Sequence, residues 1–170
     1  MFTTSEVVTL GATCAATAVA VATDIRSRRI PNTVTVATAV TGLVLAASGL
    51  SGITPAASVA GLVAGLLLML PGHVLGATGA GDVKLLAAVG SILGLNRILA
   101  AFLYSAIAGG IVAAVVAHRR GRLSRTLKMT GRLLAEPAAT RSQIEAPHAG
   151  NRFPYGPAIA AGSILAALGF

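Results

Sequence analysis

Long apolar runs occupy most of this chain, and their length leaves few folds open to it. A helix that crosses a membrane needs about 20 predominantly apolar residues. Only 11% of the residues are charged, whereas a soluble domain carries about 25%. We therefore expect an all-α membrane protein, a polytopic bundle of about six transmembrane helices that forms a single domain over residues 1–170. The expected spans cover residues 7–23, 33–50, 56–75, 83–95, 98–117 and 154–170.

Two of these spans carry features that bear on packing. The third contains Gly61 and Gly65, a four-residue spacing that permits close contact between helices in a membrane. The fourth, residues 83–95, would form a helix of only about 20 Å, against a hydrocarbon core of about 30 Å. Because Asn96 and Arg97 then interrupt the apolar pattern, we expect a short fourth span that ends at this pair, followed by a full fifth span.

The positions of the basic residues predict how the bundle is oriented. The chain has 13 Lys and Arg against 5 Asp and Glu, and a formal net charge of +8. All the Lys and Arg except Arg97 follow the first, third or fifth span, and such residues are typical of cytoplasmic loops. We therefore expect these three segments in the cytoplasm and both termini outside. The longest, residues 118–153, is a basic cytoplasmic loop that forms either an amphipathic helix on anionic lipid or a solvated segment.

Composition also argues against several classes of partner. The chain has no Trp and only two Tyr, so it is poor in the aromatic side chains on which nucleic-acid bases stack, and we expect membrane lipid, not nucleic acid, as the partner of its basic segments. Its one cysteine, Cys14, excludes an internal disulfide and a paired-cysteine zinc site. The three histidines, His73, His118 and His148, are scattered along the chain. We expect no metal and no cofactor.

Two of the few acidic residues lie at the ends of apolar runs. Asp24 closes the first run, and Asp82 stands directly before the fourth. A carboxylate near the membrane is costly and is by default a candidate functional group. With the expected orientation, both lie at the same cytoplasmic membrane edge. Two carboxyl groups held close share one proton, so one can take a proton from water while the other donates a hydrogen bond to a scissile carbonyl. Such a pair is the smallest set of catalytic groups that an aspartic protease needs.

The residues next to Asp82 fit this chemistry but also allow a structural explanation. Gly79 and Gly81 lack side chains, so a substrate can approach the backbone closely. Lys84 either anchors this end of the helix at the cytoplasmic surface or orients Asp82. In the structural alternative, Asp82 caps the fourth helix, and Asp24 pairs with a neighbouring arginine at position 26 or 28.

The motifs around the two aspartates resemble those of a known family. Asp24 is followed by Arg-Arg-Ile-Pro-Asn at 28–32, Asp82 lies in Gly-Ala-Gly-Asp-Val-Lys-Leu at 79–85, and the last span opens with Pro-Tyr-Gly-Pro-Ala-Ile at 154–159. In this order, the motifs resemble the type IV prepilin peptidases, membrane aspartic proteases of the GxGD class. The resemblance implies that Asp24 and Asp82 are catalytic. It also implies that the surrounding active-site loops include Pro31, Asn32, Gly79, Gly81 and Lys84.

The resemblance further implies an activity and a location. Members cleave the positively charged leader of type IV pilin-like precursors at the cytoplasmic face of the plasma membrane, the inner membrane where there are two. Typical longer members have a cytoplasmic domain with paired cysteines and also N-methylate the new N-terminus. This chain lacks paired cysteines and looks like the short form found with Flp/Tad-type pili. We therefore expect cleavage of a prepilin-like protein and no N-methyltransferase activity.

Two other interpretations use the same carboxylates. A general intramembrane protease of the presenilin class pairs GxGD with a Tyr-Asp motif, whereas Thr23 precedes Asp24 here. A non-enzymatic small transporter or pilus assembly subunit would use the carboxylates to bind protons or a cation. That role predicts acidic residues near the middle of spans rather than at their ends.

Overall fold

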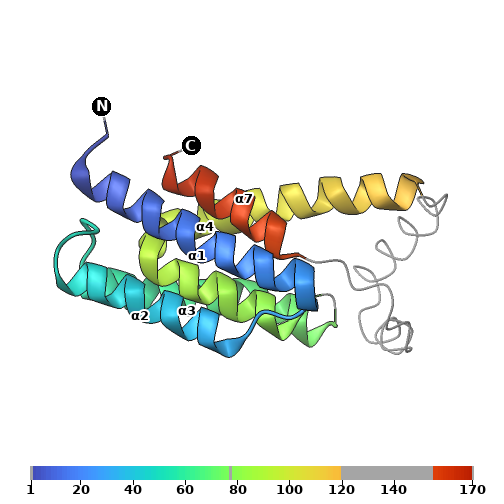
Figure 1. The fold of residues 1–170 in the computed structure, drawn as a ribbon, viewed down its shortest axis with the longest axis horizontal. Helices are drawn as coiled ribbons and strands as arrows, with labels where there is room; N and C mark the ends of the chain where they lie inside the picture. Colours follow the sequence, from blue (N-terminus) through green and yellow to red (C-terminus); the bar gives the residue numbers. More distant parts are fainter. Residues whose placement is uncertain (1, 77, 120–154, 170) are drawn as a thin grey trace.

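Every regular element in the part of the chain that the structure describes is an α-helix. The structure is a computed structural model that describes residues 2–76, 78–119 and 155–169. Its elements are α1 (Thr4–Ser27), α2 (Asn32–Ala47), α3 (Pro55–Val74), α4 (Ala80–Arg119) and α7 (Gly156–Ala167). They pack side by side in one bundle (Figure 1), which confirms the all-α prediction. The basic loop expected over residues 118–153 lies outside the described residues from position 120 onward.

The helix α4 reverses its direction part of the way along. Gly94 has a φ of 75° and a ψ of 176°, so the helix is broken there. After the break, Arg97 lies near Glu6 at the start of α1, whereas Gly109 packs against Tyr155, just before α7. Since α7 begins beside the end of α1, residues 95–119 run back along the bundle, antiparallel to residues 80–93.

A break between the fourth and fifth spans was predicted, but the residue at which it occurs was predicted wrongly. Asn96 and Arg97 are both helical, and the break falls at Gly94 instead. Glycine adopts a positive φ without the steric cost that a Cβ brings. The place of the reversal is therefore set by this backbone freedom rather than by the polarity of the two residues that follow.

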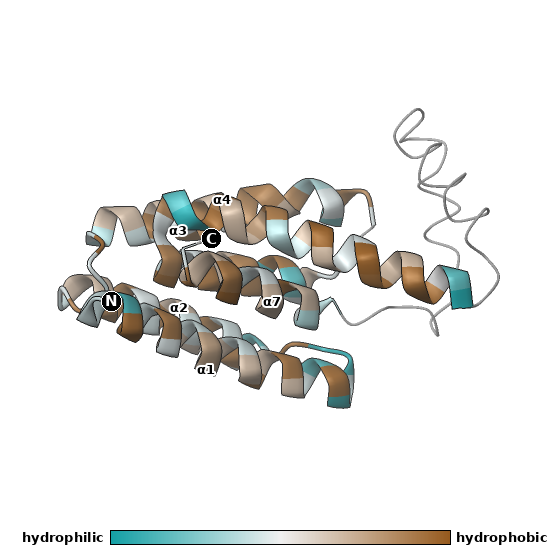
Figure 2. Cartoon of the chain, turned by 90° about the horizontal axis from the view of Figure 1, so that it is seen from above, coloured by the Kyte–Doolittle hydropathy of each residue, from teal (hydrophilic) through white to brown (hydrophobic). Residues whose placement is uncertain are grey.

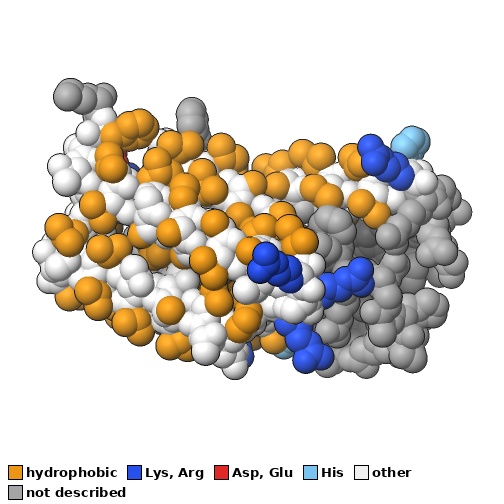
Figure 3. Space-filling model, in the orientation of Figure 1, with side chains coloured by type: hydrophobic (Ala, Val, Ile, Leu, Met, Phe, Trp, Pro, Cys, Tyr) orange, Lys and Arg blue, Asp and Glu red, His pale blue; other side chains and the backbone are white. Residues whose placement is uncertain are grey.

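On α1 to α3 the buried faces are mostly small and polar, whereas the first part of α4 buries large apolar side chains such as Leu85, Leu86 and Val89. Many other Leu, Val and Ile side chains along α1 to α4 are exposed, and Figure 3 shows apolar side chains spread over the face of the molecule in view. Lipid is as apolar as these side chains, so helices in a membrane associate through close packing of small residues and through hydrogen bonds. Buried positions that fit this rule are Thr9, Thr13, Thr17 and Ala20 on α1, Thr35, Thr38, Gly42 and Ala46 on α2, and Ser58, Gly61 and Gly65 on α3.

The closest packing joins α3 to the first part of α4. A Cβ on Gly61 would collide with the carbonyl oxygen of Gly90, and a Cβ on Gly65 would lie 2.6 Å from the carbonyl oxygen of Leu86. One turn before Gly61, the Ser58 hydroxyl donates a hydrogen bond of 2.6 Å to the Ser91 carbonyl. The close helix contact expected from the spacing of Gly61 and Gly65 is thus confirmed.

Length and composition make the chain an integral membrane protein. Thr4–Ser27, Pro55–Val74 and Ala80–Val116, the last with the reversal inside it, are long and apolar enough to cross a membrane. The apolar helices α2 and α7 are shorter, at 16 and 12 residues. Figure 2 shows apolar residues along most of the helical turns and hydrophilic ones towards the ends of α1 and α4. The count of about six transmembrane helices stays a prediction.

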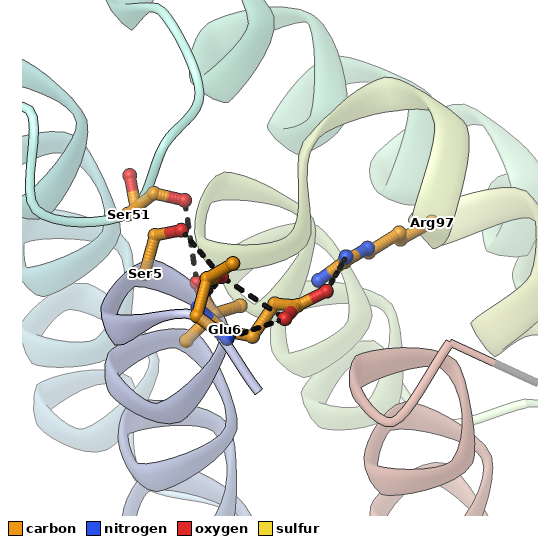
Figure 4. A network of polar contacts seen from close by, with 6 residues as sticks. Ser5, Glu6, Ser51 and Arg97 are labelled. Atoms are coloured by element: carbon orange, nitrogen blue, oxygen red, sulfur yellow. Dashed lines mark hydrogen bonds and ion pairs between the residues drawn. The ribbon is translucent and has the colours of Figure 1, made fainter. Parts of the chain in front are cut away.

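A polar network holds the start of α1 at the end of the bundle where α4 reverses (Figure 4). Thr3 and Glu6 form a capping box, in which the Thr3 N–H donates to the Glu6 carboxylate at 2.8 Å. The Arg97 guanidinium lies 3.7 Å from the same carboxylate. The hydroxyl of Thr9 donates to the Ser51 carbonyl at 3.4 Å. Arg97, the one basic residue that the expected orientation leaves outside, therefore has an acidic partner there.

Candidate active site

Asp24 lies in the last turn of α1, and its side chain is buried inside the bundle at only 6% exposure. Its carboxylate accepts a hydrogen bond of 3.1 Å from the backbone N–H of Gly156, which is 132 residues further along the chain. The helix ends at Arg28, which adopts the left-handed conformation and donates its N–H to the Asp24 carbonyl at 2.7 Å. The end of α1 thus holds a buried carboxylate next to the start of α7.

Asp82 lies in the first turn of α4. Its carboxylate accepts a hydrogen bond of 3.2 Å from the Gly79 N–H, the donor that precedes the helix. An acidic side chain that reaches back in this way satisfies one of the unpaired N–H groups of a helix start. The structural alternative is therefore seen in part: Asp82 is not the N-cap residue, but its side chain helps to cap α4 from within the first turn. Capping uses one oxygen of the carboxylate and is compatible with a chemical role.

The structure brings the two aspartates to the same end of the bundle. Asp24 stands in the last turn of α1, and Asp82 stands in the first turn of α4. Gly81, beside Asp82, packs against the buried Ile30 of the α1–α2 connection, where a Cβ would lie 3.3 Å from the isoleucine side chain. Among the described residues Asp24 makes no ion pair with Arg26 or Arg28, so the expected alternative of a structural ion pair is not seen.

The other predicted site residues lie around this pair. Asn32 and Pro31 open α2, with Pro31 at the N-cap position. The Lys84 ammonium donates a hydrogen bond of 3.0 Å to the Asn32 side-chain oxygen, which ties the start of α4 to the start of α2. A Cβ on Gly79 would lie 3.0 Å from the Asp82 carboxylate. All five predicted loop positions therefore gather at one end of the bundle, and their role towards a substrate stays a prediction.

Two residues at this site were not among the predicted site residues. Tyr155 and Gly156 precede and open α7, and Gly156 contacts Asp24 directly. The Tyr155 hydroxyl donates to the Ser105 carbonyl on α4 at 3.0 Å. The signal that could have found both residues is the Pro-Tyr-Gly-Pro run that opens the last apolar segment.

Of the basic side chains in the described residues, most gather at the same end as the aspartates. Arg26, Arg28 and Arg29 are exposed where α1 ends, and Lys84 is exposed in the first part of α4. Figure 3 shows Lys and Arg side chains concentrated towards this end of the molecule. In residues 2–76, 78–119 and 155–169, no three His, Cys, Asp or Glu side chains cluster as metal ligands would.

The fold and the site together define a membrane-embedded helical bundle with two carboxylates at one end. A family model described as the type IV leader peptidase family matches residues 11–114. This match covers more than half of the chain and includes both aspartates. The protein therefore belongs to the type IV leader peptidase family. The start of α7 lies beyond the matched stretch.

One curated relative is the "Prepilin leader peptidase/N-methyltransferase" of Bacillus subtilis (strain 168). The two sequences are 37% identical over 93 residues, which are 55% of this chain and 27% of that protein. The matched stretch is thus about a quarter of the relative's length. No solved structure matches this chain significantly.

Proposed function

We propose that the protein is a membrane aspartic endopeptidase that removes the leader peptide of type IV pilin-like precursors of the Flp/Tad type. Asp24 and Asp82 are its catalytic residues. The observation that carries the proposal is that these two aspartates, one in the last turn of α1 and the other in the first turn of α4, lie at the same end of the bundle. Membership of the type IV leader peptidase family and the likeness to the Bacillus prepilin leader peptidase supply the substrate class.

The proposed reaction needs only water and the two carboxyl groups, which share one proton between them. The ionised carboxylate takes a proton from water as the water oxygen attacks the scissile carbonyl carbon. The protonated carboxyl group donates a hydrogen bond to the carbonyl oxygen, whose charge grows during the attack. The tetrahedral intermediate then collapses, the C–N bond breaks and a proton passes to the leaving nitrogen, which restores the starting protonation of the pair.

The proposed orientation places this end of the bundle at the cytoplasmic face of the plasma membrane. The exposed arginines at the end of α1 and Lys84 support it, because basic residues are retained on the cytoplasmic side. The start of α1 and the end of α7 both lie towards the opposite end of the bundle (Figure 1), and both termini are proposed to be outside. The position of both carboxylates at helix ends, rather than midway along a helix, supports a peptidase over a proton or cation transporter.

The test is co-expression with a pilin-like precursor from the same genome. We expect the precursor to shift on a gel by the mass of its leader only when this protein is present. Mass spectrometry of the product reports both the cleavage point and the new N-terminus, which we expect to be unmethylated. No shift with any pilin-like precursor of the genome would contradict the proposed activity, and a methylated product would contradict the absence of N-methylation.

The contact between Lys84 and Asn32 gives a smaller prediction. Lys84→Met removes the 3.0 Å hydrogen bond that joins the starts of α4 and α2. Lys84 is exposed, and an exposed contact of this kind contributes about 1 kcal/mol or less, so we expect kcat/KM for cleavage to fall by roughly twofold to fivefold. Asn32→Ala should lower kcat/KM by about the same factor, and the double variant by no more than either, because both substitutions remove one interaction.

Arg26→Met, which removes an exposed cation at the same end, is the control. If the losses in kcat/KM of the two single variants added up in the double variant, the hydrogen bond between Lys84 and Asn32 would not be their cause.

A further inference from the structure

We propose that Tyr155 and Gly156 are positioning residues for Asp24, and that the start of α7 completes the active site by fixing this carboxylate. The inference rests on the proposed function and adds to it two residues outside the stretch that the family model matches. It concerns how Asp24 is held and does not depend on which precursor is cleaved.

Gly156 provides the one hydrogen bond to the Asp24 carboxylate within the described residues, at 3.1 Å. The local sequence explains why this donor is free. Pro157 has no N–H, and the N–H groups of Ala158 and Ile159 donate back to the Tyr155 carbonyl at 3.0 and 3.2 Å. The Gly156 N–H is therefore the donor left over in the first turn of α7, where the helix dipole also favours a negative charge.

The contact requires a residue without a side chain. A Cβ on Gly156 would lie 2.8 Å from the Asp24 carboxylate oxygen and 3.3 Å from the Asp24 Cβ. The φ of Gly156 is not positive, so the need for glycine comes from the close approach of α7 to α1 and not from backbone conformation. An alanine here would push the carboxylate away from the N–H group that holds it.

Tyr155 holds the start of α7 in place from the other side. Its hydroxyl donates to the Ser105 carbonyl at 3.0 Å. Its ring fills the space above Gly109, where a Cβ would collide with it. Both contacts are made with the returning part of α4, so Tyr155 fixes Gly156 between α4 and α1. The adjacent Gly110 has no neighbour within 4 Å of its Cβ position.

The first test compares cleavage kinetics of purified variants on a precursor that the wild type cleaves. Gly156→Ala should lower kcat about tenfold or more, since a displacement of about 1 Å in a catalytic group can cost 100-fold. Tyr155→Phe and Gly109→Ala should each lower kcat by about threefold to tenfold. KM should stay within about twofold, because the lost interaction orients Asp24 and does not bind substrate.

Matched glycine substitutions control for general effects on the helices. Gly11→Ala on α1 and Gly110→Ala on α4 place a methyl group where no atom lies within 4 Å, and both should leave kcat unchanged. Thermal unfolding of each variant in detergent reports the folded fraction. Wild-type kcat in folded Gly156→Ala, Tyr155→Phe and Gly109→Ala would overturn the inference while leaving the proposed function intact.

The second test measures the contact without enzyme activity. In a Cys14→Ala background, Asp24→Cys with Gly156→Cys brings the two Cβ atoms to about 3.3 Å, close to the 3.5–4.5 Å range typical of a disulfide. We expect oxidation in native membranes to cross-link this pair rapidly. The control pair, Gly11→Cys with Gly156→Cys, lies several turns away along α1 and should not react. Equal reactivity of the two pairs would overturn the inference even if no substrate were cleaved.

Discussion

Asp24→Asn and Asp82→Asn should each nearly abolish leader cleavage, with a loss of at least about a hundredfold in kcat, because a single acid or base contributes roughly 100- to 10,000-fold to such reactions. Asparagine is nearly isosteric with aspartate but can neither ionise nor carry the shared proton. The change also spares the structure, since an amide oxygen at position 24 or 82 can still accept the N–H of Gly156 or Gly79. The loss should therefore appear in kcat while the folded protein accumulates normally.

A third variant, at the opposite end of the bundle, serves as the control for this experiment. Glu6→Gln removes the acidic partner of Arg97 (Figure 4), in the first turn of α1, whereas Asp24 lies in its last turn. We expect it to cleave at the wild-type rate. The measurement is the steady-state rate of leader release by purified, folded protein. If either Asp24→Asn or Asp82→Asn retained more than a few per cent of the wild-type rate, the two-carboxylate mechanism would be wrong.

Gly61→Leu should prevent the folded protein from accumulating, and Gly61→Ala should destabilise it by about 2 kcal/mol. Any Cβ at this position collides with the Gly90 carbonyl on α4, and backbone atoms of Gly94 also lie within 3 Å. Backbone cannot move aside as a flexible side chain can, and overpacking of this kind typically costs about 1–3 kcal/mol, occasionally more. The first part of α4 is the central element of the bundle and carries Asp82, so activity should fall with stability.

Gly110→Ala is the matched control for this prediction. It lies on the part of α4 after the reversal, where nothing approaches its Cβ position, and alanine is the better helix former by about 1 kcal/mol. Unfolding of the purified proteins in mixed detergent micelles compares the variants directly. If Gly61→Ala were as stable as Gly110→Ala, the close packing of α3 on α4 would not be a main source of stability.

Much of the fold was predictable because a membrane restricts what a chain can do. Apolar length indicates helices, since a backbone in lipid must satisfy its own hydrogen bonds. The spacing of Gly61 and Gly65 indicated close packing, and α3 and α4 do pack closely there. Asp24 and Asp82 were expected at one face because each stands where an apolar run meets a basic segment, and the structure places both residues at the same end of the bundle.

The position of the reversal in α4 could not be predicted from polarity. Asn96 and Arg97 suggested a break, but in the structure they continue the helix, and Arg97 pairs with Glu6 instead. Whether a glycine turns the chain or packs against a neighbour depends on what surrounds it. Gly94 turns the chain, whereas Gly61 and Gly90 lie within helices and let them approach.

The order of apolar runs and charges along the chain is enough to establish a helical membrane protein with two carboxylates near one face, because these features act locally and repeat with the helix. The contacts that hold those carboxylates arise only when distant segments meet. Gly156 reaches Asp24 across 132 residues, Tyr155 reaches Ser105 on α4, and Lys84 reaches Asn32 on α2. Each joins two helices whose relative position depends on the packing of the whole bundle, so no local pattern could specify it.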